Sequence, residues 1–388
     1  MSKENEMNKH PRILQVLPEL NHGGVEVGTV EVASKLVEEG WKNFVASSGG
    51  RMVHDLKKLG VKHFELPLKT KNIFKLYKNS LALEKIIKEN KIDIVHARSR
   101  APAWSAYWAA KRAGVKYMTT FHGTYGLGPW GIKRFYNKVM TFGELVIAVS
   151  NHIKTHMLEN YIVDKNKIRV IHRCVNIDKF DPAKVSQERM IKTINEYRLP
   201  EDKQIILLAG RLTRWKGQGV LIDALSKLNH KNFRCLLVGS DQGRTYYTDE
   251  LKAKVKEYDL EDCVQFIGHN FDMPSLIMVS DIVVSASTDP EAFGRASVEG
   301  QAMGKVVLAS NHGGSLENVV DGKTGRLFEN NDPESLAEAL DWALNLSNIE
   351  REKISKAAIK NVLDNFTKEK MCNDVLKVYK ELEKLDVK

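Results

Sequence analysis

Short apolar runs alternate with longer helical patterns along the chain. In the first half the apolar runs lie at 12–18, 44–48, 93–97, 117–121, 145–150 and 168–172. Most are continuously apolar, as expected for strands of a parallel sheet that helices cover on both faces. The segments between them, such as VEVGTVEVASKLVEEG, have helical periodicity. This alternation of strand and helix is typical of a doubly wound α/β sheet.

The alternation stops once and then restarts. A polar stretch at 181–203 has no strand pattern, after which apolar runs resume at 204–210, 234–239, 264–268, 281–287 and 305–310. The 388 residues are also more than one hydrophobic core usually organises. We therefore predict two similar α/β domains, residues 1–190 and 191–367, with helical patterns and little strand signal from Pro333 onward.

The cysteines and the apolar segments indicate the cellular compartment. Cys174, Cys235, Cys263 and Cys372 include no pair at CxxC spacing, so neither a zinc site nor a disulfide framework is expected. The N-terminal residues MSKENEMNKHPR are too polar for a signal peptide, and no run of 18 apolar residues predicts a membrane span. We expect a cytoplasmic protein.

Positive charge is concentrated in the first half of the chain. Residues 1–190 carry 32 Lys and Arg against 18 Asp and Glu, a net charge of +14, whereas the remainder carries 27 against 31, a net charge of −4. Such a half can bind nucleic-acid phosphates or anionic lipid headgroups, or it can simply have a solvated Lys-rich surface. No recognisable nucleic-acid-binding motif accompanies the charge.

A glycine turn follows the first apolar run in Asn21-His22-Gly23-Gly24-Val25-Glu26. Glycines at a strand-to-helix turn let a ligand approach the backbone, and the helix N-terminus behind them favours an anion. The spacing is not GxGxxG, so a dinucleotide-binding fingerprint is not supported, and a plain tight turn is the alternative.

Two cations follow the first strand of the second domain in LLAGRLTRWKGQG. The strand is expected to end at Gly210, and ligands of doubly wound sheets bind beyond the carboxyl ends of the strands. Arg211 offers a planar fork of donors and Lys216 a point charge, a pair suited to a diphosphate. A solvated basic loop is the alternative.

Two acids flank the turn in EAFGRASVE. Glu291 is expected to lie in the loop after the strand at 281–287. The backbone amides of Phe293 to Arg295 are expected at the start of the next helix, where they could bind a phosphate. Glu299 lies about one turn into that helix and can accept hydrogen bonds from vicinal hydroxyls. A lone Glu291 could instead only stabilise the helix dipole.

These motifs together resemble the retaining glycosyltransferases of family 4, which have the GT-B fold. The E-x7-E motif of the family is matched by Glu291 to Glu299, and its G-R-x4-K-G motif by Gly210-Arg211 to Lys216-Gly217. The motifs occur in the order of the family.

Further segments extend the resemblance over nearly the whole chain. They are the glycine turn with Glu26, the His122 of TTFHG and the stretch 311–328. One departure is Arg173-Cys174-Val175-Asn176, where members of the family often carry Asn-Gly-Val-Asp.

The resemblance implies two Rossmann-like domains facing across a cleft, with the final helix, about 368–388, returning to the N-terminal domain. It implies a nucleotide-diphosphate sugar, UDP- or GDP-linked, as the donor.

The resemblance also implies the residues of the site. The catalytic residues would be Glu291, which holds the sugar, His122, which faces it, and Arg211 and Lys216, which neutralise the leaving diphosphate. The implied donor-binding residues are Gly23, Gly24, Arg211, Lys216, Gly239, Ile267, Gly268, His269, Met273, Glu291, Ala292, Phe293, Gly294, Arg295 and, for the ribose, Glu299.

The resemblance also implies the course of the reaction. The anomeric configuration would be retained, and the diphosphate would take the acceptor proton. No metal or other cofactor is expected, because side chains and helix termini would stabilise the developing charge, and the sequence has no DxD. Two other functions remain open: a non-hydrolysing UDP-sugar epimerase and a basic nucleic-acid-binding protein.

Acceptor choice would belong to the basic N-terminal domain. Cations alternate with aromatic residues in 66–91 and in 126–140, where Trp130 lies near Lys133 and Arg134. This pattern is typical of a surface that contacts lipid headgroups, although ordinary half-buried helices are the alternative.

Arg98 and Arg100, beyond the strand at 93–97, could bind an acidic acceptor or brace the loop. We expect a peripheral enzyme of the inner face of the cytoplasmic membrane, acting on lipopolysaccharide or a membrane glycolipid, for example as a diacylglycerol glucosyl- or glucuronosyltransferase.

Overall fold

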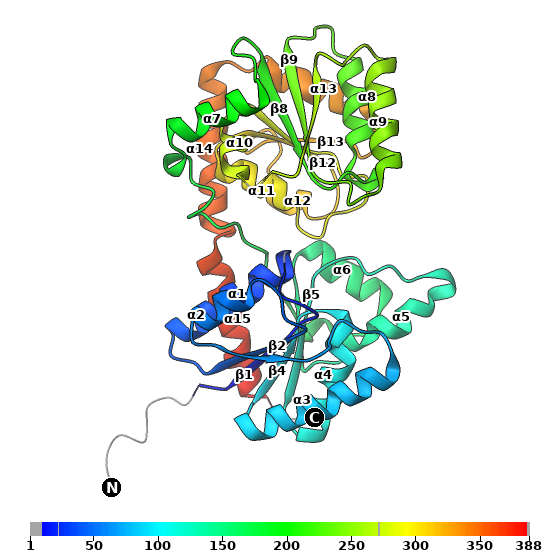
Figure 1. The fold of residues 1–388 in the computed structure, drawn as a ribbon, viewed down its shortest axis with the longest axis vertical. Coiled ribbons are helices and arrows are strands. Elements are labelled where there is room, and N and C mark those ends of the chain that lie inside the picture. The colour runs from blue at the N-terminus through cyan, green and yellow to red at the C-terminus, as the bar shows by residue number, and fades with distance from the viewer. Residues whose placement is uncertain (1–9, 22, 271, 386–388) are drawn as a thin grey trace. The chain divides into compact units, whose positions relative to one another are not determined.

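The computed structural model describes residues 10–21, 23–270 and 272–385, and for Trp130 and Ile132 the backbone alone. Over these residues the chain forms two compact units, each built on one parallel sheet (Figure 1). The first unit runs up to Arg173 and includes the residues from Glu369 on, and the second runs from Cys174 to Lys368. Residues 174–190, which the sequence analysis placed in the first domain, belong to the second unit. Their apolar side chains Val175, Phe180 and Val185 are buried in its core.

The sheet of the first unit has seven strands over the described residues, in the order β3-β2-β1-β4-β5-β6-β7. Every neighbouring pair is parallel, so the carboxyl ends of all the strands lie along one edge. The strand order reverses between β1 and β4, where ligands of such sheets bind. The strands are β1 (Ile13–Val16), β2 (Asn43–Ser47), β3 (Lys62–Glu65), β4 (Ile94–Ala97), β5 (Lys116–Phe121), β6 (Leu145–Ala148) and β7 (Ile168–Val170).

Helices cover both faces of this sheet. In Figure 1 α1 (Gly24–Glu38), α2 (Val53–Lys58) and α15 (Lys368–Glu383) lie on one side, and α3 (Ile73–Asn90) and α4 (Arg100–Ala113) pack together on the other. The unit also contains α5 (Ile132–Asn137) and α6 (Asn151–Asn160). Helix α15 is held to the sheet by the fully buried Tyr379, whose hydroxyl lies 2.7 Å from Nδ1 of His96.

The second unit repeats this plan with six strands over the described residues, in the order β10-β9-β8-β11-β12-β13. All neighbouring pairs are again parallel, and the order reverses between β8 and β11. The strands are β8 (Gln204–Ala209), β9 (Phe233–Val238), β10 (Val264–Gly268), β11 (Ile282–Ser285), β12 (Val306–Ser310) and β13 (Arg326–Phe328).

Two apolar layers enclose the second sheet. One is formed with α8 (Gln218–Ser226), α9 (Thr245–Glu257) and α13 (Pro333–Leu344). The other is formed with α7 (Gln187–Tyr197), α10 (Met273–Met278), α11 (Arg295–Ala302) and α14 (Asn348–Asn365), and Figure 1 shows this group on the opposite side from α8 and α9. The short helix α12 (Ser315–Asn318) follows β12.

The apolar runs predicted the inner strands but missed an edge strand in each sheet. Strand β3 is partly exposed along its whole length, and β13 has three residues, so neither has a continuous apolar run. The stretch 181–203, which was expected to lack strands, contains helix α7.

Candidate functional site

The predicted cations and the predicted acid of the second unit meet beyond the carboxyl ends of β8 and β11. Lys216, in a short 3-10 helix (Arg214–Lys216), forms an ion pair with Glu291, and each side chain is less than one-fifth exposed. The same carboxylate oxygen accepts a hydrogen bond of 2.6 Å from Ser287, which follows β11. The reversal of strand order between β8 and β11 therefore brings together residues 75 positions apart.

Aromatic and backbone contacts hold this loop in place. The ammonium of Lys216 lies 4.4 Å from the centre of the Trp215 ring, and the guanidinium of Arg211 lies 5.7 Å from it. The backbone carbonyl of Arg211 accepts a hydrogen bond of 2.9 Å from the buried side chain of Gln218. Arg211 and Lys216 thus flank one indole ring, and their charges gather at the end of β8.

The loop that carries Glu291 is packed against the loop after β12. The backbone amide of Gly314 donates to the carbonyl of Glu291 at 2.8 Å, and a Cβ at Gly314 would lie 2.5 Å from Cα of Phe293. Nε2 of His312 lies 2.7 Å from the carbonyl oxygen of Ser287. These contacts tie the backbone from Ser287 to Phe293 to the loop after β12.

The start of α11 lies next to this carboxylate. Gly294 is the N-cap residue with φ of 85°, and the side-chain amide of Asn318 donates to the carbonyl oxygens of Phe293 and Gly294. Because Asn318 holds these two carbonyls, the backbone conformation at the start of α11 is fixed. The Phe293 ring itself is buried, edge-on to Phe366, so only the backbone of this residue can serve a ligand.

Glu299 lies one turn into α11 and pairs with Arg295 at 2.8 Å. Its side chain is mostly buried, and burial raises its pKa, an effect that Arg295 opposes. A carboxylate that is desolvated and paired on one side is preorganised to accept further hydrogen bonds.

The remaining residues that the resemblance implied for donor binding in the second unit lie along the same edge. Gly239 follows β9 and donates its amide to the carbonyl of Gly268 at 2.7 Å. Ile267 and Gly268 end β10, the backbone of His269 follows them, and Met273 begins α10. These positions and the Lys216–Glu291 pair lie beyond the carboxyl ends of one sheet, within one unit.

The first unit has its own cluster at the carboxyl edge of its sheet. Gly23 is the N-cap residue of α1, and His122 follows β5. Arg173, which follows β7, donates to the carbonyl of Gly24 and lies 3.1 Å from Nδ1 of His122. The glycine turn and His122 are therefore joined by a residue that the sequence analysis had noted only as a departure.

The two arginines after β4 brace their surroundings. Arg98 is buried, and its Nη1 donates to Oε1 of Gln15 at 3.0 Å. Arg100 lies with its guanidinium 4.1 Å from the centre of the Tyr125 ring, and its Nη1 donates to Oδ1 of Asn137 at 3.2 Å. These contacts hold both guanidinium groups within the first unit.

Exposed apolar side chains gather on α3. Ile73, Phe74, Tyr77 and Leu81 lie at helical spacing and are exposed, Phe74 to 82%. On α5, Lys133 and Arg134 are exposed, and the backbone of Trp130 lies in the preceding 3-10 helix (Pro129–Gly131). These helices match the two stretches in which the sequence alternates cations and aromatics.

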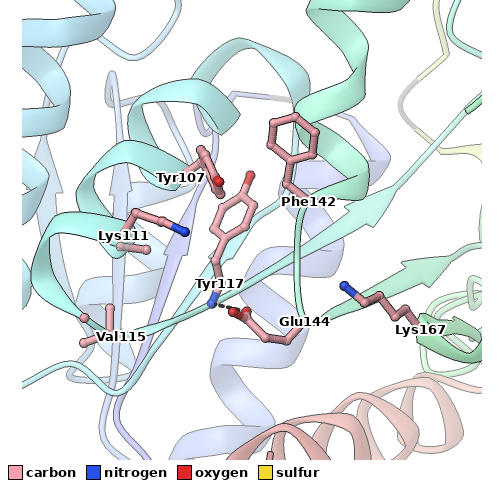
Figure 2. A pocket seen from close by; sticks show the side chains of 9 residues that line it. Tyr107, Lys111, Val115, Tyr117, Phe142, Glu144 and Lys167 are labelled. Carbon is pink, nitrogen blue, oxygen red and sulfur yellow. Dashed lines mark hydrogen bonds between the residues drawn. The ribbon is translucent and has the colours of Figure 1, made fainter. Parts of the chain in front are cut away.

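A cavity of about 220 Å³ lies at the opposite edge of the first sheet (Figure 2). It opens at the start of β5 and β6, where the amide of Tyr117 donates to Glu144 at 2.9 Å. Its other labelled walls include Tyr107, Lys111 and Phe142. No residue predicted for the site lines it.

Within the described residues, no group of three His, Cys, Asp or Glu is placed to hold a metal ion.

Comparison with known proteins identifies the family. Residues 22–179 match the family Glycosyltransferase Family 4, and residues 190–361 match Glycosyl transferases group 1. A glycosyltransferase structure from Rickettsia africae is 43% identical, with a TM-score of 0.89, and the alignment covers 97% of this chain and 99% of that one. The chain belongs to glycosyltransferase family 4.

More distant relatives agree with this assignment. This family 4 glycosyltransferase is 26% identical to N-acetyl-alpha-D-glucosaminyl L-malate synthase of Bacillus anthracis, over 92% of this chain and 93% of the relative. The structure of Anabaena HepE in complex with UDP shares the fold, with a TM-score of 0.84 at 22% identity, covering 95% of this chain and all of that one. The enzyme has the GT-B fold with two Rossmann-like domains.

Sequence reasoning missed four residues of the site: Ser287, His312, Asn318 and Arg173. His312 and Asn318 lie in the stretch 311–328, whose resemblance to the family was the available signal. The break in the family pattern at 173–176 was the signal for Arg173. Ser287 had none, because its contact with Glu291 depends on the shape of the loop.

Proposed function

We propose that this glycosyltransferase transfers a sugar from a nucleotide-diphosphate sugar to a cell-envelope acceptor, lipopolysaccharide or a membrane glycolipid, with retention and without a metal ion. The use of a nucleotide-diphosphate sugar as the donor is supported by the cluster of Arg211, Lys216 and Glu291 beside the start of α11. It combines cations for a diphosphate with an acid for sugar hydroxyls. The HepE structures hold UDP and UDP-glucose, which supports a donor of this class.

The charges of the site support metal-independent chemistry. Cleaving the sugar–phosphate bond places negative charge on the diphosphate, and preorganised cations and amides aimed at that charge lower the barrier. Arg211, Lys216 and the amides of 293–295 would supply them. Glu291 and Glu299 would bind sugar and ribose hydroxyls, and the departing diphosphate would take the acceptor proton. Transfer that is unaffected by EDTA is the expected result.

The donor can be identified by thermal-shift screening of nucleotide-sugars, followed by mass spectrometry of lipid extracts incubated with the matching donor. A donor present at 100 times its Kd is expected to stabilise the enzyme by about 2.7 kcal/mol. The expected product carries one added hexose in the α configuration if the donor is α-linked. Conversion of the nucleotide-sugar without any acceptor would indicate an epimerase instead, and a response to DNA but to no nucleotide-sugar would indicate a nucleic-acid-binding protein.

The surface of α3 supports a membrane-embedded acceptor. Its exposed Ile73, Phe74 and Tyr77 are interleaved with the exposed Lys75 and Lys78, and the net charge of residues 1–190 is +14. Apolar side chains at such a helix face enter the headgroup region while cations attract anionic lipids. No helix among the described residues is long and apolar enough to cross a membrane, so we propose peripheral association.

Flotation with phosphatidylglycerol vesicles tests this surface. We expect the enzyme to float with the vesicles at low salt and to be released at high salt. The double variant Lys75→Glu/Lys78→Glu should bind at least about 30-fold more weakly, since each surface Lys contributes about 1 kcal/mol and the new carboxylates are repelled by the anionic lipid. Lys356→Glu/Lys360→Glu on α14 makes the same charge change in the second unit, and its vesicle binding should be unchanged. Absence of flotation at low salt, or equal losses in the two variants, would contradict a membrane role for α3.

A further inference from the structure

Arg173 joins three segments of the first unit that are far apart in the sequence. It follows β7, and its two terminal nitrogens reach different targets: Nη1 lies 3.1 Å from Nδ1 of His122, and Nη2 donates to the carbonyl of Gly24. His122 follows β5, and Gly24 is the first residue of α1. One planar guanidinium thus fixes the distance between the imidazole and the glycine turn.

The contact with Arg173 determines which ring nitrogen of His122 carries hydrogen. A guanidinium can only donate hydrogen bonds, so Nδ1 must be the accepting, unprotonated nitrogen. The hydrogen of the neutral imidazole is then on Nε2. That nitrogen is buried and has no hydrogen-bond partner among the described residues. A buried donor without a partner is rare in folded proteins and marks a group held for another purpose.

The surroundings of His122 keep its ring neutral. Its pKa lies well below the ordinary value, first because of burial and then because of Arg173, Arg98 and His96. Arg98 and His96 face it from the end of β4, and Tyr125 accepts from its backbone amide at 3.3 Å. The carboxylate of Glu26, in the first turn of α1, adjoins Gly23.

Gly24 of the turn and Gly28 of α1 make room for the guanidinium. A Cβ at Gly24 would lie 2.9 Å from Nη2 of Arg173, and a Cβ at Gly28 would lie 3.5 Å from the same atom. The sequence analysis ascribed Gly24 to the approach of a ligand. In the structure a side chain of the protein occupies the space beside it.

We propose that Arg173 is a positioning residue: it orients His122 so that Nδ1 accepts its hydrogen bond and Nε2–H is presented as a fixed donor to an oxygen atom of a substrate bound at the carboxyl edge of the first sheet. In this arrangement His122 hydrogen-bonds the substrate without serving as a general base. This role rests on the proposed function, because it gives Arg173 and His122 a task in sugar transfer. The orientation of the ring can be tested without any substrate.

The first experiment is ¹⁵N NMR of the histidine side chains in the free enzyme, with the His122 signals assigned from the spectrum of His122→Asn. We expect His122 to hold its hydrogen on Nε2 and to be neutral at the pH at which an exposed histidine is half protonated, about 6.5. In Arg173→Met the ring loses a neighbouring cation and its fixed hydrogen-bond donor, so its pKa rises and the hydrogen is no longer held on Nε2 alone. A wild-type His122 with hydrogen on Nδ1, or an unchanged titration in the variant, would overturn the proposal.

The second experiment is a double-mutant cycle on the transfer reaction. Arg173→Met should lower kcat up to about 100-fold, since misplacing a contacting group by about 1 Å can cost this much. In the His122→Ala background the same change should cost less than about 3-fold, because residues that act through one another are not additive. Equal losses in both backgrounds would overturn the proposal.

Two further variants keep these outcomes interpretable. Arg173→Lys retains a cation but lacks the planar fork of donors, so an intermediate kcat is expected, and it replaces Arg173→Met if that variant does not fold. Arg112→Lys alters an ion pair with Glu84 on the surface of the same unit, and its activity should match the wild type. If no nucleotide-sugar is a donor, the proposed function fails, while the NMR result still decides the role of Arg173.

Discussion

Lys216→Met is expected to lower the kcat of sugar transfer by about 10²–10³-fold while leaving the fold intact, since removing one preorganised electrostatic group from a transition state has effects of this size. Methionine keeps most of the apolar stem beside Trp215, over which the ammonium lies at 4.4 Å. The change therefore removes the charge with little loss of packing. Because the charge on the diphosphate develops during bond cleavage, kcat and kcat/KM should fall together.

A second variant separates the two partners of Lys216. In Lys216→Met, Glu291 keeps its hydrogen bond from Ser287 but loses its ion pair. If the defect came only from this uncompensated carboxylate, Lys216→Met/Glu291→Gln would recover activity. We expect no recovery, since Lys216 acts on the diphosphate and Glu291 on the sugar. Steady-state kinetics with the identified donor provide the measurement.

The matched control for Lys216 is Lys227→Met. Lys227 forms an ion pair with Glu334 at 2.6 Å on the surface of the same unit, with both side chains substantially exposed. Exposed ion pairs contribute little to stability, so this variant should retain wild-type kinetics. Near-normal transfer by Lys216→Met, with Lys227→Met as the reference, would contradict the assignment of Lys216.

The sequence predicted those parts of the fold that depend on local pattern. Continuous apolar runs identified the inner strands, such as β8, because both faces of these strands are buried. Strands β3 and β13 escaped notice because β3 is partly exposed along its length and β13 has only three residues. Glu291 and Lys216 could be placed near each other because both follow strands of one sheet, although their ion pair could not be foreseen.

What the sequence could not predict are contacts that depend on the course of loops. Ser287 and His312 reach the Glu291 loop from the ends of two strands. Arg173 reaches His122, 51 positions earlier, and Gly24, 149 positions earlier. Such contacts require loop geometry at the precision of one hydrogen bond, and neither spacing nor hydrophobic periodicity contains that information.

Gly217→Ala is expected to destabilise the second unit by about 4 kcal/mol, the combined effect of strain at a positive φ and of overpacking, each about 1–3 kcal/mol. Gly217 has φ of 73°, and a Cβ there would overlap the carbonyl oxygen of Ala286, the residue after β11. The loop carrying Lys216 rests directly on the end of the strand that leads to Glu291. Moving Gly217 away from Ala286 would therefore also break the ion pair, so any folded fraction should have reduced transfer activity.

Gly243→Ala isolates the contribution of the overlap. Gly243 belongs to the same unit and has a similar φ of 78°, but nothing lies within 4 Å of a Cβ built there. This variant should therefore lose only about 1 kcal/mol, the cost of placing alanine in the left-handed region. Urea unfolding of the two variants measures the difference. Equal losses would mean that Gly217 is required for its φ alone, and that the close contact with Ala286 does not hold Lys216 in place.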